Sequence, residues 1–426
     1  MQFMKLHHKS SILLYLAIIS ILTITILGCG KAVKKSGKIT LDLGMWSSSP
    51  PANKLVQDQI DAFEKKYPKI KVIKQISVGG NFNEWLQINV AGGTAPNISF
   101  INSMIVQDYI GFGALKPLTK YYTKEELKAY YPNLLKGFKA NGIVYGIPKD
   151  FNTLVMYYNK DMFEAAGIPH PPRTWKELEE TLEKLQTAGK QGKLGKNFKF
   201  PMSTLMQWNR FNPFVLQNGG RTYKDGKLLF NSPEACEALD WFMSLVKKGY
   251  IVVPTRMGNQ SLGAVLGSGF TAIMFSGGWQ VPYLRQAAPN LNYGMAELPM
   301  NKKKGSMLYT VCYSILNVAD YPEESAKLLK FMTGPEAEKL TAKAGQAIPS
   351  RIEESKLFMK LYPEQKALAT SANFSVVYCW GKGSHRIDKE LNYVLLEMYI
   401  NYTQGDKSLK AKPLLDAKMQ SLKYAQ

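Results

Sequence analysis

The chain has 426 residues, of which 45% are hydrophobic and 20% charged. This composition is typical of a globular protein, excludes a disordered chain, and leaves room for two domains of about 100–200 residues each. The 54 lysines and arginines outnumber the 33 aspartates and glutamates, which gives a formal net charge of +21. The basic residues are spread along the chain, with no dense block beyond Lys302-Lys303-Lys304. We therefore expect a solvated basic surface and no nucleic-acid partner.

Residues 1–28 have the pattern of a secretory signal peptide. A basic start with Lys5 and Lys9 precedes an almost wholly apolar stretch, residues 12–27, and Gly28 then stands directly before Cys29. The apolar stretch is somewhat short for a membrane span of about 20 residues. The pattern is similar to the lipobox of bacterial lipoproteins, which implies that Cys29 is acylated and becomes the first residue of the mature chain. An uncleaved membrane anchor is the alternative, and both interpretations place the rest of the protein outside the cytoplasm.

The next residues predict a tether and then an α/β domain. Residues 29–37 are mostly polar, basic and contain glycine, which is typical of a tether. Alternating apolar residues over Lys38–Trp46 predict a strand, and helical spacing over Asn53–Tyr67 predicts a helix. Further strands are expected over Lys69–Ser77 and Asn97–Asn102. This order favours an α/β domain with a mainly parallel sheet.

The same signals predict the later elements. They indicate strands over Ile143–Pro148, Thr153–Asn159 and Thr271–Phe275, a helix after the capping box Thr174-Trp175-Lys176-Glu177, and a helix after Ser232-Pro233. Helices dominate from Pro322 onward, except for a loop over Ser375–Ser384.

Because the chain leaves one α/β unit and later returns, we predict two discontinuous lobes. In such a design the ligand lies between the lobes, at the carboxyl ends of the strands.

The chain lacks the sequence motifs of the common enzyme classes. It has no His-Glu-x-x-His, no Gly-x-Ser-x-Gly, no phosphate loop and no dinucleotide fingerprint. The cysteines beyond the lipobox, Cys236, Cys312 and Cys379, have no metal-like spacing, so we expect free thiols, no metal and no cofactor. We expect no enzymatic activity. A secreted polysaccharide-degrading enzyme remains the alternative of a different class, since distant carboxylates can form a glycosidase pair.

Several segments, in one order over nearly the whole mature chain, point to a known family. They are IDAFEKKYPKIKV (60–72), NGIVYGIP (141–148), LVMYYNKD (154–161), PRTWKEL (172–178), TAIMFSGGW (271–279) and IPSR (348–351). Together they resemble the extracellular solute-binding proteins of family 1, which serve sugar ABC transporters and include maltose-binding protein. The resemblance implies a two-lobe, periplasmic-binding-protein-like α/β fold of class II type. Its hinge crossings are expected near Pro148–Asn152, Met274–Ser276 and Tyr313–Asn317. These crossings divide the chain into a first lobe of residues 38–149 and 275–316 and a second lobe of residues 150–274 and 317–426.

The resemblance also implies a function. We expect a monomeric lipoprotein, held on the extracytoplasmic face of the cell membrane through Cys29. It would bind a carbohydrate, and more specifically an oligosaccharide, and deliver it to the permease subunits of an ABC importer. A binding protein for an anionic solute, such as an acidic oligosaccharide or glycerol phosphate, is one alternative. An adhesion or sensing subunit that shares the fold is another.

The candidate ligand-binding residues suit a sugar. A pyranose ring stacks its apolar C–H face on an indole, and its hydroxyls need planar polar partners. The resemblance assigns stacking to Trp279 and Trp380, and contacts from the second lobe to Gln207, Trp208 and Asn209.

The first lobe and the hinge supply four more candidates, Trp46, Ser47, Asp150 and Asn152, and Arg351, which follows Ile-Pro-Ser, is the last candidate. The acidic residues that maltose-binding protein uses after its first and third strands are replaced here by Ser47–Ser49 and Asn102-Ser103-Met104. Maltose is therefore not expected, and acidic or phosphorylated sugars gain weight. For an anionic ligand, Arg210 or Arg351 would supply the positive charge.

Overall fold

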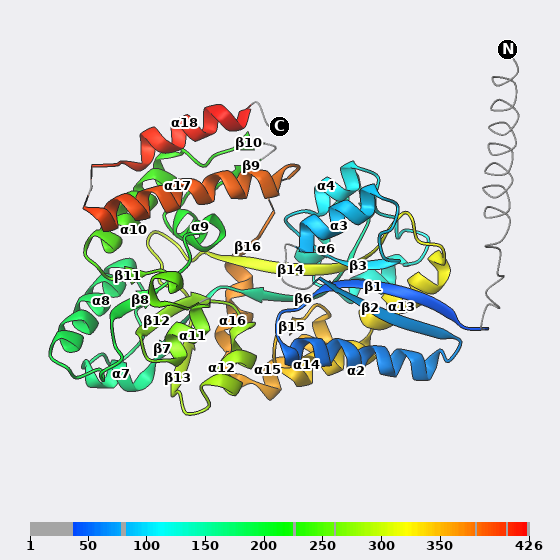
Figure 1. Ribbon diagram of the computed structural model, residues 1–426, viewed down its shortest axis with the longest axis horizontal. Coiled ribbons are helices and arrows are strands. Elements are labelled where there is room, and N and C mark those ends of the chain that lie inside the picture. The colour runs from blue at the N-terminus through cyan, green and yellow to red at the C-terminus, as the bar shows by residue number, and fades with distance from the viewer. Residues whose placement is uncertain are drawn as a thin grey trace, which may run out of the picture.

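The computed structural model describes residues 37–77, 82–224, 227–259, 261–379, 381–405 and 408–423, with only the backbone of residue 423. This part of the chain forms two α/β lobes that lie side by side and are joined by strands β6 (Ile147–Thr153) and β14 (Ser306–Ile315) (Figure 1). The expected signal peptide, the lipobox Cys29 and all but residue 37 of the expected tether lie outside the described residues. None of the described helices has the length and apolar character that a membrane crossing needs.

The first lobe is built on a mixed sheet of seven described strands. The strand order is β15-β6-β14-β3-β1-β2, with β16 beside β14. The bounds are β1 Ile39–Trp46, β2 Ile70–Ser77, β3 Ile98–Asn102, β15 Ile348–Pro349 and β16 Ser375–Val377. Strand β1 is parallel to β2 and β3, whereas β14 is antiparallel to β3 and β6. The sheet is therefore not mainly parallel, because β14 returns from the second lobe and enters in the opposite direction.

The second lobe is built on a sheet with the strand order β11-β8-β12-β7-β13. The bounds are β7 Val155–Asn159, β8 Phe200–Ser203, β11 Ile251–Val252, β12 Thr271–Ser276 and β13 Tyr293–Ala296. Strand β8 runs parallel to β11 and β12, and β7 runs antiparallel to β12 and β13. Two small hairpins complete the described strands, β4 (Lys139–Ala140) with β5 (Ile143–Val144), and β9 (Tyr223–Lys224) with β10 (Lys227–Leu228).

Helices cover both sheets (Figure 1). In chain order they are α2 (Pro50–Lys66), α3 (Phe82–Ala91), α4 (Val106–Gly111), α5 (Lys124–Lys128), α6 (Pro132–Gly137), α7 (Lys160–Ala165), α8 (Trp175–Lys190), α9 (Trp208–Gln217), α10 (Pro233–Lys247), α11 (Leu262–Gly267), α12 (Gln280–Ala287), α13 (Pro322–Met332), α14 (Pro335–Ala344), α15 (Ile352–Leu361), α16 (Lys366–Ser371), α17 (Ser384–Gln404) and α18 (Ala411–Lys423). Short 3-10 turns lie at Pro254–Met257, Pro363–Gln365 and Ala372–Phe374.

Local chemistry fixes where the predicted helices begin. Helix α2 starts before the expected Asn53 because Ser49 caps it, with Ser49 Oγ accepting from the Ala52 N–H at 3.2 Å, and because Pro50 fits the first turn. Helix α8 has the predicted cap, Thr174 Oγ accepting from the Glu177 N–H at 3.1 Å. The Glu177 carboxylate, however, accepts from the Arg173 N–H at 2.7 Å and not from Thr174.

One strand pairing and the contacts of two helices differ from the expected lobe boundaries. Strand β13 pairs with β7 in the second sheet. The crossing back to the first lobe therefore lies between Ala296 and Ser306, and not near Met274–Ser276. Helices α13 and α14 contact α2 in the first lobe, although residues 317–426 were assigned to the second. Helices α17 and α18 contact α10 of the second lobe. The rest of the expected assignment of residues to the two lobes stays a prediction.

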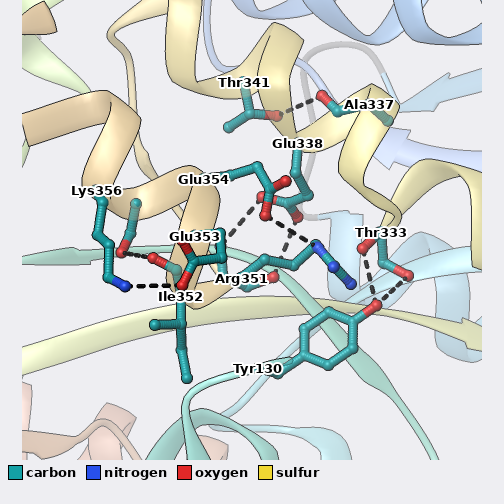
Figure 2. Close-up of polar contacts among 12 residues, drawn as sticks. Tyr130, Thr333, Ala337, Glu338, Thr341, Arg351, Ile352, Glu353, Glu354 and Lys356 are labelled. Carbon is teal, nitrogen blue, oxygen red and sulfur yellow. Dashed lines mark hydrogen bonds and ion pairs between the residues drawn. The ribbon is translucent and has the colours of Figure 1, made fainter. Parts of the chain in front are cut away.

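A buried carboxyl group ties α14 to the crossing strand β6. Glu338 Oε2 accepts from the Ser350 N–H at 3.1 Å, and Ser350 Oγ lies 3.1 Å from Glu338 Oε1 and 2.6 Å from the Pro148 carbonyl oxygen. Figure 2 shows Glu338 with Arg351 and Glu354 around this junction. Burial, together with the negative charge of Asp150, raises the pKa of Glu338 well above its usual value. A neutral Glu338 can donate its proton to Ser350 Oγ while that hydroxyl donates to Pro148.

We expect Glu338→Gln to make the protein less sensitive to rising pH. The pKa of Glu338 is raised on folding from its usual value of 4.5, so above that pH the unfolded state loses a proton that the folded state keeps. Wild-type stability then falls with pH by up to about 1.4 kcal/mol per unit until the folded pKa is passed. Urea unfolding at several pH values between 4.5 and 8 should show the variant gaining stability relative to wild type. A constant difference across that range would mean that Glu338 is ionised in the folded protein.

Candidate ligand-binding cleft

A cavity of about 520 Å³ lies between the two lobes. This volume is in the range of small-molecule binding sites. The lining includes Trp46, Ser48, Ser49 and Asn102 from the first lobe, Lys149, Asp150, Asn152 and Tyr309 from the two crossing strands, and Arg210, Trp279 and Gln280 from the second lobe. Trp46 and Asn102 end the parallel strands β1 and β3, so the cavity lies at the carboxyl ends of these strands, as the fold predicts.

Trp46 is held by aromatic neighbours of the first lobe. Its ring packs edge-on against Phe82 at 5.4 Å and Phe100 at 5.2 Å between centroids. The indole stays half-buried, so part of it remains available to a ligand in the cavity.

Trp279 is positioned by the turn that follows β12. Asn152 Oδ1 accepts from the Gly278 N–H at 3.0 Å, and Tyr157 Oη donates to the Gly277 carbonyl at 2.9 Å. A Cβ atom at Gly277 would lie 2.3 Å from the Trp279 ring, and one at Gly278 would lie 2.4 Å from Asn152 Oδ1. Both glycines are thus required by close contacts, and the half-buried Trp279 ring lies folded over its own turn.

Arg210 is the functional residue that the sugar interpretation missed. It lies in the first turn of α9, with its guanidinium carbon 5.0 Å from the Trp279 ring and 5.2 Å from the Tyr309 ring. The atoms Nε and Nη1 are buried and have no hydrogen-bond partner among the described residues. The sequence offered Arg210 only for an anionic ligand, and assigned the sugar contacts to its neighbours Gln207, Trp208 and Asn209.

The structure does not bring those three neighbours into the cavity. Trp208 is fully buried in the second lobe, edge-on to Phe211 and Phe230. Asn209 is buried, and its carbonyl oxygen and Oδ1 each accept from Tyr309 Oη at 3.0 Å. Gln207 lines a separate groove beside α17. One helical turn therefore presents Arg210 to the cavity and turns its neighbours away.

Two further candidates also lie elsewhere, and one candidate is not described. Ser47 Oγ accepts from Asn53 Nδ2 at 2.8 Å, and the next two serines line the cavity instead. Arg351 lies outside the lining, where its Nε donates to Glu354 Oε2 at 3.1 Å and its guanidinium covers the Tyr130 ring (Figure 2). Trp380 lies outside the described residues. Of the predicted candidates, Trp46, Asp150, Asn152 and Trp279 line the cavity.

The described ranges contain no cluster of His, Cys, Asp or Glu side chains that could hold a metal ion. Cys236, Cys312 and Cys379 are free thiols, and the third is only half-buried. Burial raises the pKa of the Cys236 thiol to about 11 and that of Cys312 to about 12, so neither is a reactive thiolate near neutral pH.

Comparison with known proteins places the chain among bacterial binding proteins. The family model of bacterial extracellular solute-binding proteins matches residues 58–370. The sn-glycerol-3-phosphate-binding periplasmic protein of Escherichia coli is 24% identical over 241 residues, which are 53% of this chain and 54% of that protein. The chain spans between 54% and 66% of the length of curated relatives that it matches.

Two solved structures share the fold. An ABC substrate-binding protein from Listeria monocytogenes, in complex with cycloalternan, superposes with a TM-score of 0.80 at 23% identity over 91% of this chain and 99% of that one. An ABC transporter solute-binding protein from Thermotoga lettingae, bound with alpha-D-tagatose, gives 0.79 at 21% identity over 91% and 99% of the two chains. The predicted two-lobe, periplasmic-binding-protein-like α/β fold is thereby confirmed.

Because Trp208 packs in the core, we expect Trp208→Ala to destabilise the fold. Loss of a fully buried indole costs about 3–5 kcal/mol of the free energy of unfolding, which urea unfolding followed by circular dichroism would measure. Trp208→Phe should cost less, since the Trp208 Nε1 atom has no hydrogen-bond partner among the described residues. Tyr393→Ala, at a side chain that is 51% exposed, is the surface control. Equal stability of Trp208→Ala and this control would contradict the core placement.

Proposed function

We propose, from the premise that this chain belongs to the bacterial extracellular solute-binding protein family, that it captures a carbohydrate in the interlobe cleft and delivers it to the permease of an ABC importer. The family supplies the non-enzymatic, solute-binding component of such transporters, so a substrate and the transporter subunits are its implied partners. We propose a carbohydrate, and more specifically an oligosaccharide, as the ligand of this chain.

The observation that carries the proposal is the pair of indoles that line one cavity from opposite lobes. Trp46 comes from the first lobe and Trp279 from the second, and both are half-buried. Indole faces suit the apolar C–H face of a pyranose. The amide side chains of Asn102, Asn152 and Gln280 line the same cavity and can both donate to and accept from sugar hydroxyls.

The carbohydrate-bound structural neighbours support the same class of ligand. Those two proteins are bound to cycloalternan and alpha-D-tagatose, respectively, and we extend this class of ligand to the present chain. An anionic solute is the second candidate. It is favoured by the presence of Arg210 and Lys149 in the lining, and the Escherichia coli relative is a binding protein for sn-glycerol 3-phosphate.

We further propose that ligand closes the two lobes about β6 and β14. Ser306 Oγ at the start of β14 donates to the Leu154 carbonyl, just after β6, at 2.7 Å, so the two crossing strands are linked where they leave the first sheet. A ligand stabilises a closed state only through contacts that both lobes make, and Trp46 and Trp279 would supply such contacts.

We expect at least one saccharide in a panel of neutral and acidic oligosaccharides to raise the melting temperature of the protein saturably, without being cleaved. A ligand at about 100 times its dissociation constant adds roughly 2.7 kcal/mol to the free energy of unfolding. Trp279→Ala should weaken binding of that saccharide by about 1–3 kcal/mol, the scale of one lost stacking contact.

Two controls belong to this experiment. Tyr393→Ala removes an exposed aromatic ring of α17, outside the cavity, and should leave the affinity unchanged. Chromatography of the sugars after incubation tests for cleavage. If no saccharide raises the melting temperature, or if a sugar is cleaved, the proposed function is refuted. Unchanged affinity in Trp279→Ala would refute only the placement of the site.

We also propose that acylated Cys29 holds the protein on the extracytoplasmic face of the membrane. Cys29→Ser should then move the protein from the membrane fraction to the soluble fraction and abolish its labelling by a radioactive fatty acid. Wild type and Cys236→Ser, a change at a buried thiol, should both remain labelled. A Cys29→Ser protein that stays in the membrane would favour the uncleaved anchor instead.

A further inference from the structure

The described lining of the cleft holds more positive than negative charge. Its charged side chains are Lys149, Asp150 and Arg210. Lys149 and Asp150 form an ion pair with each other, so their charges offset. Arg210 is left as a cation that no acidic side chain of the described lining neutralises.

Arg210 differs in this respect from the other arginines that the described residues place over aromatic rings. Arg285 lies 5.0 Å from the Tyr362 ring and pairs with Glu364 at 3.4 Å. Arg351 lies 5.4 Å from the Tyr130 ring and pairs with Glu354 at 3.1 Å. Arg210 has the rings of Trp279 and Tyr309 but no carboxylate partner in the described ranges.

Two of the three nitrogen atoms of the Arg210 guanidinium also lack hydrogen-bond acceptors among the described residues. Its Nε and Nη1 atoms are buried without an acceptor among the described residues. Aromatic faces offset part of a cationic charge, but they do not replace in-plane oxygen acceptors, and an unpaired buried donor is costly. A ligand with a negative charge and oxygen acceptors would both balance the charge of Arg210 and accept hydrogen bonds from its unpaired N–H groups.

The first turn of α9 holds Arg210 in place before any ligand arrives. The Trp208 N–H donates to Asn392 Oδ1 of α17 at 2.5 Å. Asn209 accepts from Tyr309 of β14 and donates from Nδ2 to Tyr378 Oη at 3.2 Å. Contacts from separate elements thus fix the turn from which Arg210 extends, and the rings of Trp279 and Tyr309 hold its guanidinium in the lining of the cleft.

We propose that the ligand is an acidic saccharide whose carboxylate or phosphate group pairs with Arg210 while its sugar ring lies against the neighbouring indole. This inference rests on the proposed function, because it takes the saccharide and the cleft as given. It adds that the ligand carries a negative charge and that Arg210 recognises this charge. A neutral hydroxyl could accept hydrogen bonds from Arg210 but would leave its charge unbalanced.

The test uses saccharide pairs that differ only in an anionic group. Digalacturonate against galactobiose, and cellobiouronate against cellobiose, test a carboxylate, whereas glucose 6-phosphate against glucose tests a phosphate. Calorimetric titration of the full-length protein should show, in at least one pair, the acidic member binding at least about tenfold tighter, the scale of a charged hydrogen bond. Arg210→Gln should remove this preference. Arg285→Gln, which removes a ring-covering arginine outside the cleft, should keep it.

Each outcome decides a different point. Equal or tighter binding of the neutral members by wild type overturns the acidic-ligand inference and leaves the proposed function standing. An acid preference that survives in Arg210→Gln overturns the role of Arg210. No binding of any saccharide by a folded wild type refutes the proposed function, and the inference is refuted with it.

A second variant and the salt dependence serve if Arg210→Gln does not fold. Arg210→Lys should then retain a reduced preference for the acidic saccharide, and the wild-type preference should shrink with added salt. A preference that does not depend on salt overturns the ion pair.

Discussion

The hydrogen bond between Asn152 and the Gly278 N–H connects the strand that crosses between the lobes to the turn that carries Trp279. The position of Trp279 in the cleft depends on this hydrogen bond. Asn152 lies on β6, which pairs with β14 and β15 in the first sheet, whereas the turn follows β12 of the second sheet. The position of Trp279 is therefore set from the boundary between the lobes. The close approach of Gly277 and Gly278 to the Trp279 ring and to Asn152 leaves no space for a side chain, so the turn has little freedom to move away.

The crossing strand β6 also places the charged side chains of Lys149 and Asp150 near the hinge. Asp150 faces the cleft as the partner of Lys149, and its negative charge adds to burial in raising the pKa of Glu338 behind it. Two neighbouring carboxylates in a poorly solvated region do not both ionise readily. The junction can thus keep Glu338 neutral, so that its carboxyl group bridges α14 to the strand that carries Pro148.

Arg210 also shows how the core supports the site. Trp208 anchors the start of α9 among aromatic rings, and the Asn209 contacts join it to β14. The buried neighbours contribute stability and orientation, and the residue that follows them faces the cavity. Such a division of roles within one turn is common where a rigid element presents a single side chain to a ligand.

The sequence by itself determined the class of fold, the strands β1, β2, β3, β7 and β12, the starts of α8 and α10, and the Gly-Gly-Trp turn. These features depend on local signals: apolar periodicity, caps such as Thr174 and Ser232, and glycines before an indole. It also indicated the family through segments in a shared order. Only the tertiary structure decided that β13 pairs with β7, because strand pairing is a long-range contact with no local signature. It likewise decided which side chain of Gln207-Trp208-Asn209-Arg210 faces the cavity. Residues on one helical turn point in different directions, and only the packing of α9 against β14 and α17 fixes which direction is the cleft.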